Sequence, residues 1–89
     1  MEVTLKVTYR GDKLQAVRKS RGLSQSELAQ KSGINRRTLQ DYEQGSKDLN
    51  SAKLETILRL CVALECKMID IINSPDMVEL LHQYGEQGR

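Results

Sequence analysis

The sequence predicts an all-α domain, and three observations support that prediction. From residue 12 onward, apolar residues recur at intervals of three and four, which is the spacing of one face of an α-helix. Polar residues of the kind that cap helices precede several of these segments, and glycines follow them. Only residues 3–8 (VTLKVT) alternate like a strand, and a lone strand needs a partner that no second segment of the chain clearly offers.

Length and composition fit one small domain. The chain has 89 residues, of which 29% are charged, with three Tyr and neither Trp nor Phe. A small core must therefore be built from aliphatic residues and cysteine. The charge is uneven, because residues 1–45 carry nine Lys and Arg against five Asp and Glu, whereas residues 46–89 carry five against seven. The first half of the chain accordingly favours an anionic partner.

Helix starts are marked by repeated local signals. Asp12 with Gln15, and Ser24 with Glu27, have the spacing of capping boxes, and Gly22 ends the first of these two helices. A hydrophobic residue before a cap and another after it, as in a hydrophobic staple, recur three times. These pairs are Leu23 and Leu28 around Ser24, Ile34 and Leu39 around Asn35, and Leu49 and Leu54 around Asn50.

The second half of the chain predicts further helices. Residues 51–64 read as the longest one, and residues 67–72 and 76–84 as two short ones, with Pro75 between them. The apolar face predicted for the long helix consists of Leu54, Ile57, Leu58, Cys61 and Leu64.

The two ends of the chain lie outside the main helical pattern. Residues 3–8 could pair with a second copy of the chain, pack as an extended arm or stay disordered. The expected organisation is an N-terminal strand or arm over residues 1–10, a helical domain over 11–73 and a C-terminal extension over 74–89.

Catalysis and metal binding have little support. Cys61 and Cys66 sit in an apolar helical pattern and are expected to be reduced core thiols. His82 stands alone, without a metal-ligand spacing. No nucleophile elbow, phosphate-binding loop or carboxylate cluster is present, so we expect no enzyme activity, no metal and no cofactor. The absence of a signal peptide or a membrane-length apolar run predicts a cytoplasmic protein.

Residues 24–44 predict two short helices joined by the segment KSGI. A small residue, Ala29, lets the second helix cross the first closely, and Gly33 suits a tight turn with positive φ. The residues expected to fill the angle between the helices are Leu28, Ile34, Leu39 and Tyr42. The residues left on the outer face of the second helix are Arg36, Arg37, Gln40 and Gln44.

At these residues the sequence resembles the lambda-repressor-like helix-turn-helix family, which includes phage repressors of the Cro type and xenobiotic-response-type bacterial regulators. The resemblance extends over about residues 12–72 and rests on the segments RKSRGLSQSELAQKSGINRRTLQDYEQG and LETILRLCVALECKMIDII. It implies a five-helix domain that places its third helix in the major groove of DNA. The chain departs from the family pattern at Ser32, in a longer loop 45–50, and at Glu65, where a helix-ending glycine is usual. Glu65 is therefore expected in a left-handed conformation.

The resemblance also implies roles for particular residues. It makes Arg36, Arg37 and Gln40 candidates for base contacts, with Asn35 capping their helix and touching DNA. It further implies that Arg18 pairs with Glu43 and, with Ala29 and Gly33, supports the recognition helix. Phosphate contacts are expected at the start of the preceding helix and in the loop after the recognition helix. The phosphate candidates are Ser24, Gln25, Ser46 and Lys47.

Arg36 and Arg37 are informative because they open a helix. Positive charge in a first turn opposes the helix dipole and costs up to about 1 kcal/mol. A bidentate arginine–guanine contact contributes about 1–3 kcal/mol of discrimination against a wrong base, which is larger. An ordinary solvated basic face is the alternative reading of the pair.

The predicted function is a sequence-specific, double-stranded-DNA-binding transcriptional regulator, a repressor, acting as a homodimer on a two-fold operator. Residues 1–8 and 76–84 are the expected dimer contacts. One alternative is an antitoxin-type interaction module that binds a partner protein, such as a toxin, as well as DNA. Another is a helix-turn-helix fold used only as a scaffold.

Overall fold

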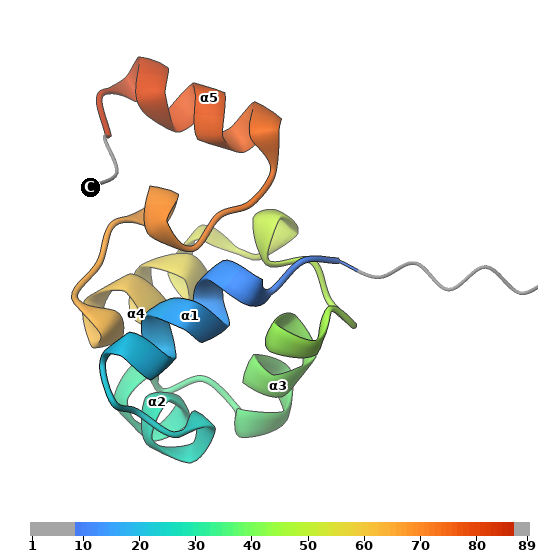
Figure 1. Cartoon of the computed structure of the whole chain (residues 1–89), viewed down its shortest axis with the longest axis vertical. Helices are drawn as coiled ribbons and strands as arrows, with labels where there is room; N and C mark the ends of the chain where they lie inside the picture. Colours follow the sequence, from blue (N-terminus) through green and yellow to red (C-terminus); the bar gives the residue numbers. More distant parts are fainter. Residues whose placement is uncertain (1–8, 87–89) are drawn as a thin grey trace, which may run out of the picture.

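The computed structural model describes residues 9–86, and within this range it is all helical (Figure 1). The α-helices are α1 (Asp12–Ser20), α2 (Gln25–Ser32), α3 (Arg36–Gln44), α4 (Leu54–Leu64) and α5 (Pro75–Tyr84). Two 3₁₀ turns, η1 (Leu49–Ser51) and η2 (Met68–Asp70), complete the order. The predicted five-helix, all-α class is confirmed, whereas the predicted strand 3–8 lies outside the described residues.

One core holds the helices together. Its fully buried side chains come from α1 to α4 and from the segment after η2, and are Leu14, Leu28, Leu39, Leu60, Leu64, Ile71 and Ile72. Each such burial contributes about 1.5–3 kcal/mol relative to an exposed side chain. The helix α2 contacts both α3 and α4, and α1 crosses in front of α4 in Figure 1. The core thus fixes α3 relative to the rest of the fold.

The start of α1 differs from the prediction. Gly11 is the N-cap residue and no side chain caps the helix, so the capping box predicted at Asp12 is wrong. Asp12 instead pairs with Arg10 at 3.2 Å. Gly11 sits against the end of α3, where a Cβ atom would meet the backbone of Tyr42 and Glu43. The chain therefore enters α1 through a backbone contact that only glycine allows.

The predicted apolar face of α4 is partly wrong. Ile57, Cys61 and Leu64 are buried as expected, but Leu54 and Leu58 are 62% and 44% exposed. Leu60 and Ala63 are buried in their place. The staple predicted around Asn50 is also wrong, because Asn50 does not cap α4. It lies in a separate turn, η1, that Asp48 caps, and α4 begins only at Leu54.

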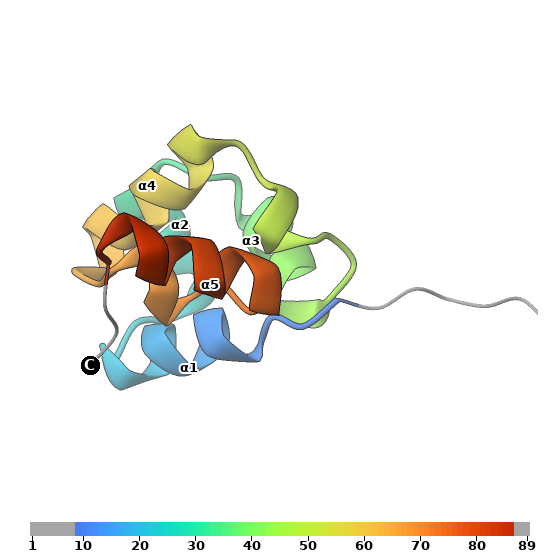
Figure 2. The ribbon, with the colours of Figure 1, turned by 90° about the horizontal axis from the view of Figure 1, so that it is seen from above.

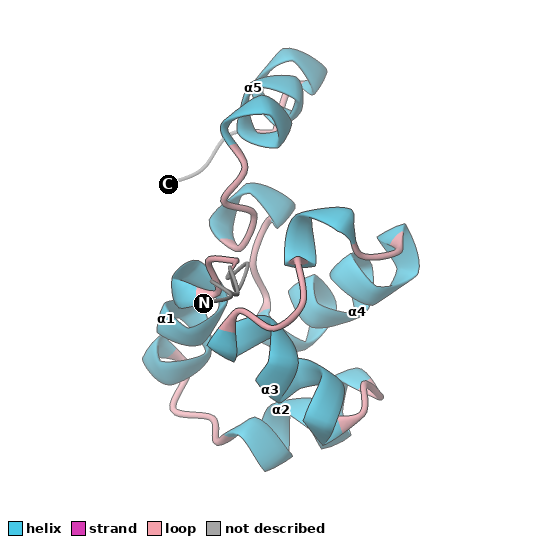
Figure 3. Ribbon diagram, turned by 90° about the vertical axis from the view of Figure 1, so that its right-hand side faces the viewer, coloured by secondary structure: helices cyan, strands magenta, loops and turns pink. Residues whose placement is uncertain are grey.

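Within residues 67–72 only Met68–Asp70 are helical, as a 3₁₀ turn, so the short helix predicted there is wrong. The helix α5 confirms the one predicted at 76–84. Lys13 fixes this region from α1, because its Nζ donates to the carbonyls of Ile69 and Ile72 at 2.7 Å each. The Ile69 amide donates to the Glu86 carboxylate at 2.6 Å. Figure 2 shows α5 lying across the other helices, and Figure 3 shows it at the end opposite α2 and α3.

No helix within residues 9–86 has the length and apolar character needed to cross a bilayer.

Candidate nucleic-acid interface

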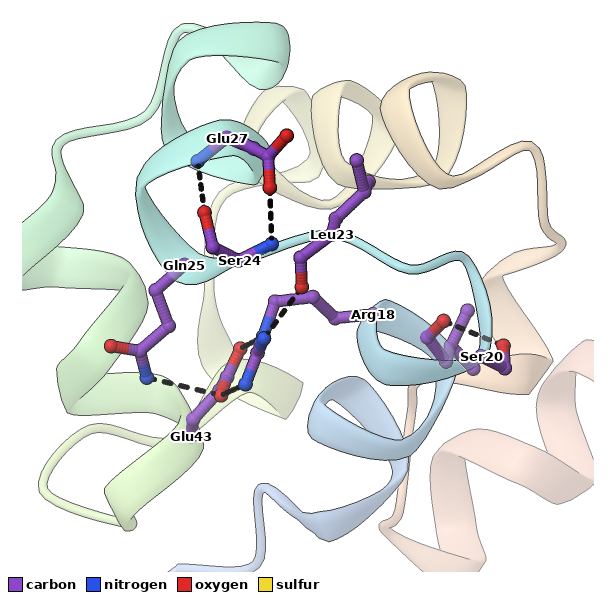
Figure 4. A network of polar contacts seen from close by, with 8 residues as sticks. Arg18, Ser20, Leu23, Ser24, Gln25, Glu27 and Glu43 are labelled. Atoms are coloured by element: carbon purple, nitrogen blue, oxygen red, sulfur yellow. Dashed lines mark hydrogen bonds and ion pairs between the residues drawn. The ribbon is translucent and has the colours of Figure 1, made fainter.

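The helix α2 begins at a complete capping box. The Ser24 hydroxyl accepts from the Glu27 amide at 3.0 Å, and the Glu27 carboxylate accepts from the Ser24 amide at 2.9 Å (Figure 4). Hydrogen bonding of the carboxylate with Ser24, first with its amide and then with its side chain, lowers the pKa of Glu27 below its ordinary value of 4.5. The sequence prediction of this box is confirmed.

The turn between α2 and α3 depends on Gly33. Its φ of 73° is left-handed, and its amide donates to the Ala29 carbonyl at 2.9 Å. Ser32, the departure from the family pattern, is buried yet satisfied, because its hydroxyl donates to the Ala29 carbonyl and accepts from the Ile34 amide. A polar residue is therefore accommodated here without a buried unpaired group.

The helix α3 has one buried side and one exposed side. Asn35 caps it, because Oδ1 accepts from the amides of Arg37 and Thr38. The inward residues Leu39, Tyr42 and Glu43 are buried. The outward side consists of Arg36, Arg37 and Gln44, which are exposed, and Gln40, which is half-buried. The structure thus brings the four predicted base-contact residues, Asn35, Arg36, Arg37 and Gln40, to one end and one side of α3.

The two arginines at this end differ. The Arg36 side chain makes no hydrogen bond or ion pair with any residue that the structure describes. Arg37 donates from Nε to Asp41 Oδ1 at 3.4 Å, but its side chain stays 82% exposed. An exposed pair at this helical spacing is worth only about 0.3–0.5 kcal/mol, so it leaves Arg37 free to exchange partners.

A buried ion pair connects α1 to α3 behind this surface. Arg18 donates from Nε and Nη2 to both Glu43 oxygens, at 2.7 and 3.0 Å, and from Nη1 to the Leu23 carbonyl at 2.7 Å (Figure 4). The Glu43 side chain is 1% exposed. A bidentate guanidinium–carboxylate pair has fixed geometry, and it therefore orients α3 on the fold.

The four predicted phosphate contacts lie at two places. Ser24 and the half-buried Gln25 stand at the start of α2, and the exposed Ser46 and Lys47 follow α3. Gln25 has a contact that sequence reasoning missed, because its Nε2 donates to Glu43 at 3.1 Å. The Lys47 ammonium is 4.0 Å from Asp41. The Asp41 carboxylate is therefore turned toward two cations of its own chain.

Arg21, which was not among the predicted site residues, has a structural use. Its guanidinium donates to the carbonyls of Leu64 and Glu65, at 2.7 and 3.2 Å, at the end of α4. Glu65 has a φ of 52°, as predicted from its place where glycine is usual. A helix end without glycine gains from a cation at its last carbonyls, and that is the signal that could have identified Arg21.

No group of three or more His, Cys, Asp and Glu able to hold a metal occurs within residues 9–86.

The fold defines a helix-turn-helix domain with two exposed arginines at the start of α3. The Helix-turn-helix family model matches residues 14–71, and the chain belongs to this family, of the lambda-repressor-like, xenobiotic-response type. It is therefore a DNA-binding transcriptional regulator.

Among solved structures, the chain is similar to the restriction-modification controller protein C.AhdI from Aeromonas hydrophila. The two are 33% identical, with a TM-score of 0.61, over 67% of this chain and 86% of that one. No curated protein matches the chain.

Proposed function

We propose that the protein is a sequence-specific regulator that reads the major groove of double-stranded DNA with α3. The observation that carries this proposal is the position and exposure of Arg36 and Arg37. Both open a helix whose dipole disfavours positive charge, both are exposed, and Arg36 has no partner within residues 9–86. A solvated basic face would gain nothing from this position, whereas guanine edges and phosphates supply the missing negative partner.

The base contacts follow from what each side chain has free. Arg36 and Arg37 can each present two N–H groups to one guanine. Gln40, a turn further along α3, can pair with adenine. Asn35 uses its Oδ1 as the helix cap, so that only its amide nitrogen remains to donate to DNA.

The phosphate contacts surround this reading end. The free amides at the start of α2 favour an anion, and the Ser24 hydroxyl and Gln25 amide can donate to it. Gln25 has one Nε2 hydrogen left after its bond to Glu43, so that a phosphate there is coupled to the buried ion pair. Ser46 and Lys47 would hold the backbone on the other side of α3.

The protein acts as a homodimeric repressor in this proposal. One such domain buries limited area on DNA, and a two-fold operator lets two copies bind half-sites about one helical turn apart. Leu80 and Tyr84 support α5 as the dimer contact, because both are large apolar side chains that this helix leaves exposed and that a second copy could cover. Occupation of a promoter by the dimer would block transcription, and the protein is expected in the cytoplasm with its DNA.

The similarity to a restriction-modification controller suggests which genes to test first. We propose that promoters of restriction-modification genes in the source genome are candidate operators. Binding to such a promoter in preference to unrelated promoters supports this choice. Equal binding to both rejects the choice of promoter and leaves the proposal of DNA binding by α3 standing.

Selection of bound sequences from random duplex DNA tests the main proposal. The recovered operator is then measured with the Arg36→Ala, Arg37→Ala double variant, for which we expect a loss of at least about tenfold in affinity and relaxed preference at guanine positions. Lys67→Ala is the control and should leave affinity for the operator unchanged. It removes a positive charge from the segment between α4 and η2, which lies on the side of the domain opposite α3 (Figure 1). A double variant that binds the operator as tightly as the parent would support the scaffold alternative instead.

A further inference from the structure

The two cysteines meet at the C-terminal end of α4. The Cys66 amide donates to the Cys61 carbonyl at 3.0 Å, and the Glu65 amide donates to the Val62 carbonyl at 3.3 Å. With Glu65 in the left-handed conformation, these bonds are those of a Schellman motif. In that motif the side chains at the positions of Cys61 and Cys66 turn toward each other, so the fold itself brings the two thiols together.

The thiols interact and are chemically unequal. Hydrogen bonding with the neighbouring Cys61 thiol lowers the pKa of Cys66. The same bond, together with burial, raises the pKa of Cys61. Among the charged groups around Cys66, Arg21 also lowers its pKa, while Asp70 and Glu86 oppose the change. A thiolate therefore forms first on Cys66, and Cys61 remains a thiol beside it.

A small reagent can reach this pair. Both cysteines line an open cavity of about 720 Å³ between α4 and the segment around η2. Cys66 also lines a second open cavity of about 500 Å³, on the side of α1 and α5. Cys61 is buried and Cys66 half-buried, so a solute in the cavity meets Cys66. Two thiols used only as core filler would not need such access.

We infer that Cys61 and Cys66 form a dithiol site that hydrogen peroxide oxidises to an intramolecular disulfide. In the first step the Cys66 thiolate attacks one peroxide oxygen; an S–O bond forms, the O–O bond breaks, and the leaving hydroxide takes a proton to become water. In the second step the Cys61 sulfur attacks the Cys66 sulfenic acid, and the S–S bond replaces the S–O bond. The hydroxide lost in this step leaves as water with the Cys61 proton. The balance is two thiols and one peroxide giving one disulfide and two waters.

The helix end is suited to the product. The hydrogen bonds of the motif hold the backbone of Cys61 close to that of Cys66 before oxidation, which is what a disulfide requires. The chain between them already turns back on itself at Glu65. The disulfide therefore adds a cross-link to an existing turn.

Treatment of the reduced full-length protein with one equivalent of hydrogen peroxide tests the inference. We expect intact mass spectrometry to show the loss of two hydrogen atoms on a single chain, reversed by a thiol reductant, and peptide mapping to join Cys61 to Cys66. A protein that stays reduced, or that joins two chains through Cys66, would overturn the inference.

Three variants separate the roles of the two thiols. Cys61→Ser keeps a hydrogen-bond donor but cannot close the disulfide, so we expect a sulfenic acid at Cys66 that dimedone traps. Cys61→Ala removes the hydrogen-bonding group beside Cys66, and trapping should be slower than in Cys61→Ser by about tenfold, because the thiolate fraction of Cys66 falls. Cys66→Ser should leave Cys61 almost unreactive. Equal dimedone labelling of Cys61 and Cys66 in these variants, with circular dichroism showing them folded, would contradict the inequality on which the mechanism depends.

Discussion

The Arg18–Glu43 pair illustrates how much depends on single residues. Both side chains are nearly out of solvent, and together they satisfy the Leu23 carbonyl and Gln25 amide as well as each other. Removing one partner of a buried pair leaves an uncompensated charge, which costs about 3–5 kcal/mol. We therefore expect Glu43→Ala to lose about this much unfolding free energy, a large share of the about 5–15 kcal/mol typical of a domain. Urea denaturation followed by circular dichroism measures it.

Arg10 provides the control for this prediction. It pairs with Asp12 at 3.2 Å, but its side chain is 77% exposed. Exposed pairs contribute about 0–1 kcal/mol, so Arg10→Ala should leave stability nearly unchanged. Similar losses in the two variants would show that the pair behind α3 is solvated in solution.

For single residues, the sequence predicted helix caps and backbone conformation better than it predicted contacts between distant residues. The Ser24 box and the Asn35 cap follow from local signals, the left-handed Glu65 follows from the family pattern, and all three are present. The hydrogen bond of Gln25 to Glu43 and the use of Arg21 at the end of α4 depend on which distant residues become neighbours. The missing glycine at the end of α4 indicates that a cation is useful there, but no local pattern says which distant residue supplies it. The DNA contacts assigned to α3 stay a prediction.

At the scale of elements, the approach of α1 to α3 is set by Gly11. Its φ of −116° is open to any residue, but a Cβ would lie 2.7 Å from Glu43 Cα. Backbone cannot move aside as a flexible side chain can, so we expect Gly11→Ala to cost about 3 kcal/mol, at the upper end of overpacking. Thermal denaturation measures this.

Gly22→Ala separates crowding from backbone strain. Gly22 has a φ of 71°, and a Cβ there would meet no atom within 4 Å. Only the left-handed conformation is then penalised, at about 1–2 kcal/mol. If Gly22→Ala proved the more damaging of the two, the close contact between α1 and α3 would be refuted.

The capping box of α2 makes a prediction about pH. Because folding lowers the pKa of Glu27, the box stabilises the fold fully above the ordinary value of 4.5 and loses this effect as pH falls through the folded value. Ser24→Ala should move the Glu27 pKa part of the way back toward 4.5, because it removes the contribution of the Ser24 side chain and leaves that of the Ser24 amide. Carbon-detected NMR titration of the carboxyl group measures the shift, and Ser26→Ala, at an exposed neighbour, should cause none.

The helices that were predicted least accurately lack such local signals. Residues 57–64 are apolar on nearly every side of α4, so periodicity alone could not decide which side is buried. Packing against α2 decides it, and Leu54, Leu58 and Val62 are left exposed. Likewise, the apolar segment 67–72 gave no length signal that distinguishes a short helix from the 3₁₀ turn at η2.

For the whole molecule, two exposed apolar surfaces compete as the dimer interface. One consists of Leu80 and Tyr84 on α5, which are 56% and 84% exposed. The other consists of Leu54, Leu58 and Val62 on α4. The sequence favoured the first, together with residues 1–8, which lie outside the described part of the chain. Neither surface contains the start of α3, which is proposed to contact bases, so both leave it free.

Substitutions at exposed positions can distinguish these surfaces without disturbing the core. If α5 forms the interface, Leu80→Ser with Tyr84→Ser removes apolar contacts from both copies, and the dimer dissociation constant should rise by at least about a hundredfold. Sedimentation equilibrium measures it, and affinity for the two-fold operator should fall while affinity for an isolated half-site is retained. Leu54→Ser with Val62→Ser is the matched control on α4 and should leave the dimer intact. Dissociation of the α4 variant alone would move the interface there, and a parent protein that is monomeric at all concentrations would exclude the homodimer.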